Sequence, residues 1–192
     1  MNRASMRFAL FLFLCAAAVV MSAGLAAGQK PTAAQEDAAA PSAAPSAVAS
    51  SFWRIYHNDK YGFEVKYPDG WRINAGSGSG AEIIAISQPL GAGEPRGSMT
   101  LAIQPNENPR KLSIKEWFAG QLRALKATPE SQGAVTIGGQ PAMFMENTNS
   151  FGTQHSTFTL LHETDVLSFG YTRQAQLEPT YAAIIASFHV VK

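Results

Sequence analysis

The sequence predicts an α+β domain built on a mainly antiparallel β-sheet. Beyond residue 52, apolar residues recur at every second position in several short runs, and turn signals separate these runs. The period changes to that of a helix at two places, residues 113–126 and the segment after Pro179. Strands in hairpin order pair antiparallel, and their apolar faces need helices to cover them.

The first 28 residues have the three parts of a secretory signal. Arg3 and Arg7 precede an uninterrupted apolar run, residues 8–21, and small residues follow as far as Gly28. We expect cleavage near residues 26–28. A retained N-terminal membrane anchor is the alternative, because a stretch of this length can span a bilayer. Either way the remaining chain is expected to be exported: periplasmic or secreted, or membrane-anchored and facing the periplasm.

Residues 29–51 are dominated by Ala, Pro and Ser and show no apolar periodicity, so they are expected to form a disordered tether. The globular domain then covers residues 52–192. The single cysteine, Cys15, lies in the apolar run of the signal. If the signal is removed, disulfides, thiolate catalysis and cysteine-ligated zinc are all excluded.

The domain opens with a run of alternating aromatic residues. Four apolar side chains share one face of a predicted strand: Tyr61, Phe63, Val65 and Tyr67. Pro68-Asp69-Gly70 then predicts a type I turn, with Pro at the second position and Gly at the fourth. Trp71 and Ile73 resume the alternation, which predicts a strand–turn–strand unit whose rings fill the core rather than line a binding surface.

The middle of the chain adds two strands and a helix. Residues 82–87 and 98–104 are the predicted strands, joined by a loop rich in Gly and Pro. Ser113 and Glu116 form a capping box at the start of a helix over residues 113–126, and Leu112 with Trp117 fits a hydrophobic staple.

Two hairpins and a second helix complete the domain. Gly138-Gly139 joins the strands 135–137 and 142–147, and a longer hairpin runs from 156–162 to 167–171 around a turn at 163–165. The last helix starts at Pro179 and buries one stripe: Tyr181, Ile184, Ile185 and Phe188.

Three segments together resemble the PsbP-like superfamily. They are Tyr61-Gly62-Phe63 followed by residues 67–71 (YPDGW), residues 137–142 (IGGQPA), and residues 184–188 (IIASF). The resemblance implies a PsbP-like α/β/α sandwich. The fold is shared by an extrinsic protein of the photosynthetic oxygen-evolving complex, a Ran-binding import factor and bacterial envelope proteins. It further implies a non-enzymatic binding or assembly role, although fold alone does not fix chemistry.

Catalytic, metal and cofactor sites are not expected. The four histidines, His57, His155, His162 and His189, lack the close spacing of a metal motif, and His155 and His162 are expected on opposite faces of one strand. A looser set of His162 with Glu163 or Asp165 is the metal alternative. Residues 75–80 (AGSGSG) match neither a hydrolase nucleophile elbow nor a phosphate loop, and are expected to form a flexible hairpin connection.

The charges give one candidate surface. Residues 52–192 contain twelve basic and twelve acidic residues, so a nucleic acid is not an expected partner. Basic residues cluster around the first helix, and two tryptophans complete the candidate partner or ligand surface: Arg110, Lys111, Lys115, Arg123 and Lys126, with Trp71 and Trp117. The alternative is an ordinary solvated helix face.

The leading functional hypothesis is a non-catalytic exported module that binds a protein partner or membrane complex in the cell envelope. The alternative is a small-ligand or lipid carrier with Trp71, Trp117 and the aromatic hairpin lining a pocket between sheet and helix. An unrecognised hydrolase is the third hypothesis.

Overall fold

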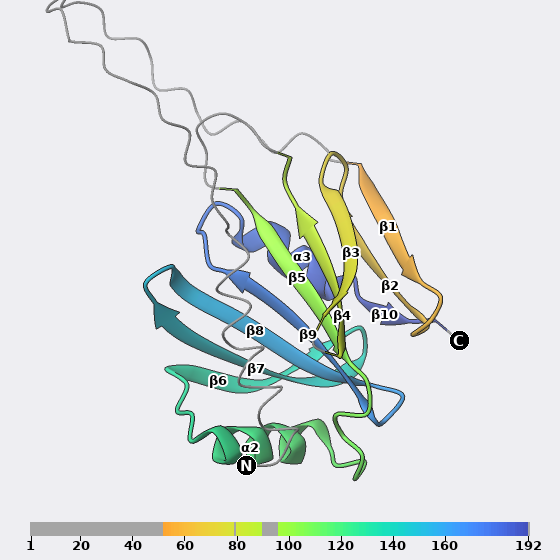
Figure 1. The fold of residues 1–192 in the computed structure, drawn as a ribbon. Helices are drawn as coiled ribbons and strands as arrows, with labels where there is room; N and C mark the ends of the chain where they lie inside the picture. Colours follow the sequence, from red (N-terminus) through yellow and green to blue (C-terminus); the bar gives the residue numbers. More distant parts are fainter. Residues whose placement is uncertain (1–51, 79, 90–95, 192) are drawn as a thin grey trace, which may run out of the picture.

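The computed structural model describes residues 52–78, 80–89 and 96–191. The predicted signal or anchor, the tether and most of the Gly/Pro-rich loop after residue 89 lie outside the described residues. The described part contains two antiparallel sheets and two helices, which confirms the predicted α+β class (Figure 1). Neither of its helices has the length and apolar character needed to cross a bilayer.

The smaller sheet has three strands in the order β1-β2-β10. They are β1 (Trp53–Asn58), β2 (Phe63–Pro68) and β10 (His189–Val190). The larger sheet has seven strands in the order β3-β4-β5-β9-β8-β7-β6. They are β3 (Arg72–Gly78), β4 (Ala81–Ser87), β5 (Ser98–Gln104), β6 (Ser131–Ile137), β7 (Gln140–Asn149), β8 (Gly152–Leu161) and β9 (Asp165–Thr172).

The turn after β2 corrects the predicted strand–turn–strand unit. Trp71 N–H donates to the Pro68 carbonyl at 3.2 Å, so Gly70 is the third turn residue, and its φ of +84° is the mark of a type II turn rather than type I. The strands on either side belong to different sheets: β2 pairs with β1 and β10, whereas β3 pairs with β4. The turn therefore carries the chain from one sheet to the other.

One core joins the two sheets around the helix α3 (Glu178–Ala186). The Phe188 ring lies 5.8 Å from Phe63 of β2 and 5.7 Å from Phe169 of β9. Tyr181 and Ile184 of α3 are fully buried in the same core. The last helix is thus confirmed, with Glu178 ahead of Pro179 at its start.

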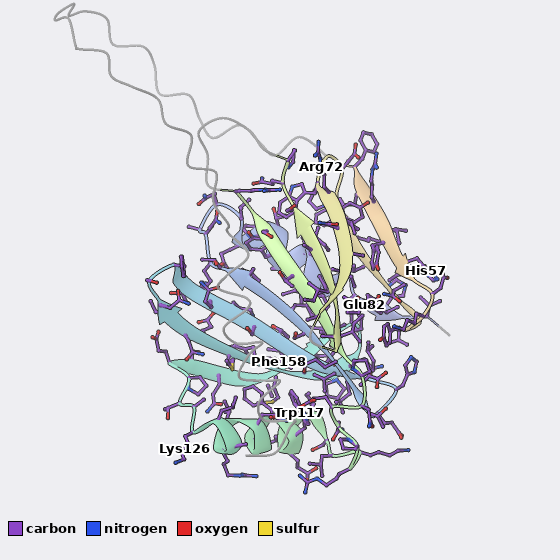
Figure 2. All side chains as sticks on the ribbon, viewed as in Figure 1. His57, Arg72, Glu82, Trp117, Lys126 and Phe158 are labelled. Carbon is purple, nitrogen blue, oxygen red and sulfur yellow. The ribbon has the colours of Figure 1, made fainter. Side chains whose placement is uncertain are left out.

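A second core lies on the opposite face of the seven-stranded sheet, beneath α2 (Ile114–Leu125). Ser113 and Glu116 form the predicted capping box. Trp117 and Phe118 pack on Phe158 of β8, at ring distances of 5.9 and 5.7 Å (Figure 2). Helices therefore cover both faces of this sheet.

Three local predictions need correction. β1 and β10 were not predicted at all. Residues 75–78, expected to lie in a flexible connection, continue β3 as a regular strand paired with β4. His162 was expected within a strand, but β8 ends at Leu161 and His162 lies in the following turn, with φ of +50°.

The Gly138-Gly139 turn between β6 and β7 provides a matched test of the fold. Both glycines have positive φ, +53° and +76°. A Cβ at Gly138 would overlap the backbone carbonyl of Phe188, whereas a Cβ at Gly139 would meet nothing within 4 Å. We expect Gly138→Ala to lower the free energy of unfolding by more than about 3 kcal/mol, and Gly139→Ala by about 1 kcal/mol from strain alone. Urea unfolding of both variants checks this, and equal losses would contradict the packing of this turn against Phe188.

Candidate functional site

The five predicted basic residues lie within α2 or next to its ends, and all are exposed: Arg110, Lys111, Lys115, Arg123 and Lys126. Lys111 Nζ forms an ion pair with Glu163 Oε2 at 2.8 Å, and this pairing lowers the pKa of the Glu163 carboxyl. Glu116 is engaged by the helix cap. Binding of an acidic partner at this surface stays a prediction.

The two tryptophans do not join that surface, and this is a correction. Trp117 is 3% exposed and lies in the core beneath α2. Trp71 is half-buried in the other core, where its ring stands edge-on to Tyr181 at 6.3 Å. Because the sheet separates the two cores, Trp71 and Trp117 cannot line one carrier pocket.

The structure shows a different surface, which sequence reasoning missed. Phe52, Trp53 and Ile55 are 82%, 38% and 56% exposed. Trp53 and Ile55 lie on β1, the border strand of the smaller sheet, and Phe52 immediately precedes this strand (Figure 1). We call these three residues the β1 patch. Large apolar side chains in one exposed cluster are typical of an interaction site.

The alternation of β1 explains the exposure of Trp53 and Ile55. Tyr56 and Asn58 point to the inner, covered face of the sheet, so Trp53 and Ile55 point outward. Ile55 lies opposite Lys66 on β2, and Trp53 lies opposite Pro68.

Polar contacts hold the start of the domain in place. Asp69 N–H donates to the Phe52 carbonyl at 2.7 Å, and Arg54 Nε binds Asp69 Oδ1 at 2.6 Å. The β1 patch is therefore presented on a fixed strand.

A row of ionisable side chains borders the patch on the same outer face. Glu64 of β2 contacts His57 of β1 through Oε1 at 3.0 Å and His189 of β10 through Oε2 at 3.1 Å. His57 Nε2 also contacts Asp59 Oδ1 at 2.8 Å. These groups satisfy one another, and the described residues contain no group of three or more His, Cys, Asp or Glu arranged to hold a metal ion.

An open depression of 360 Å³ lies beside Lys60, Glu82 and Pro105. Lys60 Nζ binds Glu82 Oε2 at 3.0 Å and lies 4.7 Å from the centre of the Tyr61 ring. Much of the remaining lining consists of glycine, serine and alanine. The depression offers little of the apolar surface that a carrier pocket needs.

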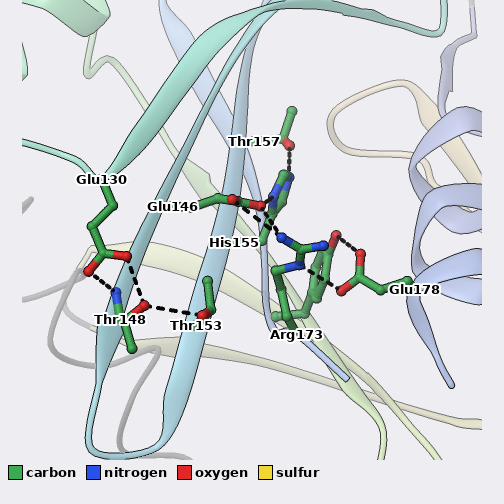
Figure 3. A network of polar contacts seen from close by, with 9 residues as sticks. Glu130, Glu146, Thr148, Thr153, His155, Thr157, Arg173 and Glu178 are labelled. Atoms are coloured by element: carbon green, nitrogen blue, oxygen red, sulfur yellow. Dashed lines mark hydrogen bonds and ion pairs between the residues drawn. The ribbon is translucent and has the colours of Figure 1, made fainter. Parts of the chain in front are cut away.

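His155 on β8 is the centre of an arrangement that resembles a hydrolytic triad. Its Nδ1 lies 2.9 Å from Glu146 Oε1, and its Nε2 lies 2.9 Å from Thr157 Oγ1 (Figure 3). An acid, a base and a hydroxyl in this order are the parts of a nucleophilic site. Sequence reasoning missed it because the three residues show no motif spacing.

Burial argues against chemistry at this triad. Thr157 is 2% exposed. The His155 ring is stacked between Phe144, at 5.7 Å, and Tyr171, at 4.9 Å. A substrate therefore cannot approach the hydroxyl in this structure.

The network instead ties neighbouring strands together. Arg173 bridges Glu146 of β7 and Glu178 of α3 at 3.3 and 3.2 Å (Figure 3). Tyr171 continues the ring stack to Tyr181 of α3 at 4.3 Å. The triad geometry is thus explained as the polar and aromatic link between the sheet and α3.

Comparison with solved protein structures identifies the fold of this chain. No family model and no curated protein matches the chain. The solution structure of cyanobacterial PsbP (CyanoP) from Synechocystis matches with a TM-score of 0.50 and 15% identity, over 79% of this chain and 99% of that one. The fold is PsbP-like. The predicted resemblance is therefore confirmed at the level of architecture.

Two other solved structures resemble the PsbP-like domain more weakly. A Bacteroides thetaiotaomicron protein has a TM-score of 0.47 and 12% identity, over 72% of this chain and 48% of its own. PA94, a Pseudomonas aeruginosa protein of unknown function, has a TM-score of 0.43 and 15% identity, over 70% of this chain and 94% of its own.

Two tyrosines that contact each other, Tyr171 and Tyr181, predict how the free energy of unfolding depends on pH in the alkaline range. Burial raises the pKa of both Tyr171 and Tyr181 above the ordinary tyrosine value. Above about pH 10 the unfolded chain therefore loses protons that the folded chain retains, and the free energy of unfolding falls as pH rises. We expect a fall of up to about 1.4 kcal/mol per pH unit for each tyrosine.

Urea titrations between pH 9 and 11.5 check this, with Tyr181→Phe as the comparison. The variant starts less stable, because Ser98 N–H donates to the Tyr181 hydroxyl at 3.0 Å. The free energy of unfolding of the variant should fall less steeply with rising pH than that of the wild type. Parallel slopes would show that Tyr181 ionises equally in both states.

Proposed function

We propose that this chain is a non-catalytic, exported binding module of the cell envelope, and that the β1 patch is its contact surface for a protein partner. The observation that carries the proposal is the exposure of Trp53 and Ile55 on the border strand β1 and of Phe52 immediately before it. The export signal predicted from the sequence supports the location, and the burial of Thr157 argues against the Glu146–His155–Thr157 arrangement as a catalytic site.

The composition of the surface fits a protein–protein contact. Binding energy in such contacts concentrates in a few apolar or aromatic anchors surrounded by polar groups. The β1 patch has polar groups on the same face: Ile55 lies opposite Lys66, and the face continues with the His57–Glu64 contact. Because His57 and Glu64 contact each other, covering them with a partner would leave neither group without a polar contact.

The place of the patch in the chain also fits. The predicted tether ends at residue 51, and the patch begins at Phe52. A module carried on such a tether would present its border strand close to the point of attachment. A partner in the same envelope compartment would then meet the patch at a raised effective concentration.

The β1 patch can be tested by removing its two most exposed side chains. Burying each contributes about 1.5–3 kcal/mol to a complex. We therefore expect the double variant Phe52→Ser and Ile55→Ser to reduce recovery of the cross-linked partner at least tenfold. The measurement is cross-linking in cells, followed by purification of the tagged chain and quantitative mass spectrometry.

Phe151→Ser is the matched control, because Phe151 is 62% exposed at the distant β7–β8 turn. An envelope protein recovered with the wild type and with the control, and lost with the double variant, supports the proposal. Equal recovery with all three proteins would refute the β1 patch as the contact surface. Thermal unfolding of each variant confirms that folding is unchanged.

A further inference from the structure

The strand β6 is an unprotected edge of the seven-stranded sheet. In the described part of the chain it pairs with β7 alone (Figure 1). Its seven residues, SQGAVTI, contain neither a charge nor a proline. Proteins normally protect an exposed edge with such residues, because unpaired backbone groups attract another strand. The other long edges differ: β1 carries Arg54 and His57, and β3 begins with Arg72.

We propose that β6 pairs antiparallel with β6 of a second copy of this chain, about a twofold axis at Ala134. The seven-stranded sheets of the two copies then form one continuous sheet. In this register Ala134 lies opposite its own counterpart, and Val135 lies opposite Gly133 of the other copy. Twofold pairing is self-complementary, so each contact occurs twice.

Side chains on one face of the sheet favour this register. Gly133 and Val135 lie on the same face as Phe144, because Gly133 is paired directly with Phe144 and Val135 with Ala142. The Phe144 ring lies over Gly133: a Cβ built there would be 2.7 Å from Phe144 Cε1. Val135 is 37% exposed at the edge. In the proposed register, Val135 of each copy lies beside the Phe144 ring that covers Gly133 of the other copy.

Electrostatics and the position of α2 also favour a second copy. Like charges opposite each other in a strand pair are destabilising. A twofold axis brings residues near it close to the identical residues of the other copy. An uncharged strand avoids this repulsion. α2 packs on β7 and β8, and five of the seven residues of β6 are exposed. Since one strand pair is a small interface, the dimer is expected to be weak and concentration-dependent.

Sedimentation velocity of the full chain in mild detergent, over a hundredfold concentration range, tests the dimer. Ala134→Lys sets two lysines opposite each other, and should keep the chain monomeric at concentrations where the wild type dimerises. Ala75→Lys is the matched control, because Ala75 is an exposed alanine on the edge strand β3. The Ala75→Lys variant should dimerise like the wild type. A monomeric wild type, or equal dimerisation of both lysine variants, overturns the proposal.

Mixing Ala134→Lys with Ala134→Glu distinguishes repulsion from misfolding. Opposite charges should restore a dimer, which damage to the strand would not do. Failure of the mixture to dimerise, with each variant folded by circular dichroism, also overturns the proposal.

Disulfide formation tests the register, with Cys15 replaced by serine. Directly opposed Cα atoms in an antiparallel pair lie about 4.5–5.5 Å apart, within reach of a disulfide. Ala134→Cys should therefore cross-link two copies on oxidation. Val135→Cys should not, since its counterpart is displaced to about 8 Å. Cross-linking at 135 without cross-linking at 134 would refute the axis at Ala134. The Phe52 and Ile55 variants leave β6 unchanged, so this dimer and the β1 patch can fail independently.

Discussion

The seven-stranded sheet must bury both of its faces, and the rest of the structure depends on this constraint. Adjacent residues of β9 show it directly: Val166 lies in the core beneath α2, and Leu167 lies in the core around α3. α2 closes the first face. α3 has nine residues, and on the second face the smaller sheet shares the core with it through Phe63 and Val65 of β2. The described part of the molecule therefore has two cores separated by one sheet.

This arrangement decides where the candidate site can be. The smaller sheet contributes only its inner face to a core, so its outer face is not required for folding. Exposing Trp53 and Ile55 there forgoes about 1.5–3 kcal/mol of burial for each side chain. Tyr56, one position away, packs against the shared core. Exposed apolar clusters are typical of interaction sites, which is the basis of the proposed contact at this face.

The sequence predicts those features that are set by neighbouring residues. Ser113 with Glu116 marks the start of α2, and two glycines in succession mark the β6–β7 turn, because both signals depend on local backbone geometry. The partners of β2 depend on distant residues: Lys66 N–H donates to Ser187 Oγ, 121 positions along the chain. The spacing of apolar residues also identifies one face of a strand or helix, but it does not say whether other residues cover that face. For this reason Trp117 was assigned to a surface although it is buried, and the β1 patch was missed.

The Glu146–His155–Thr157 arrangement and the β1 patch differ in how far the fold uses their side chains. The first has the distances of a catalytic triad, yet its hydroxyl is buried and its imidazole is engaged on both ring faces and at both nitrogens. The second has no catalytic chemistry, yet its side chains are left free by the fold. A group whose contacts are all internal contributes to stability, and only a group with an unused face can contribute to binding. By this criterion the two surfaces that we propose for binding lie at the borders of the sheets, where β1 and β6 have exposed residues.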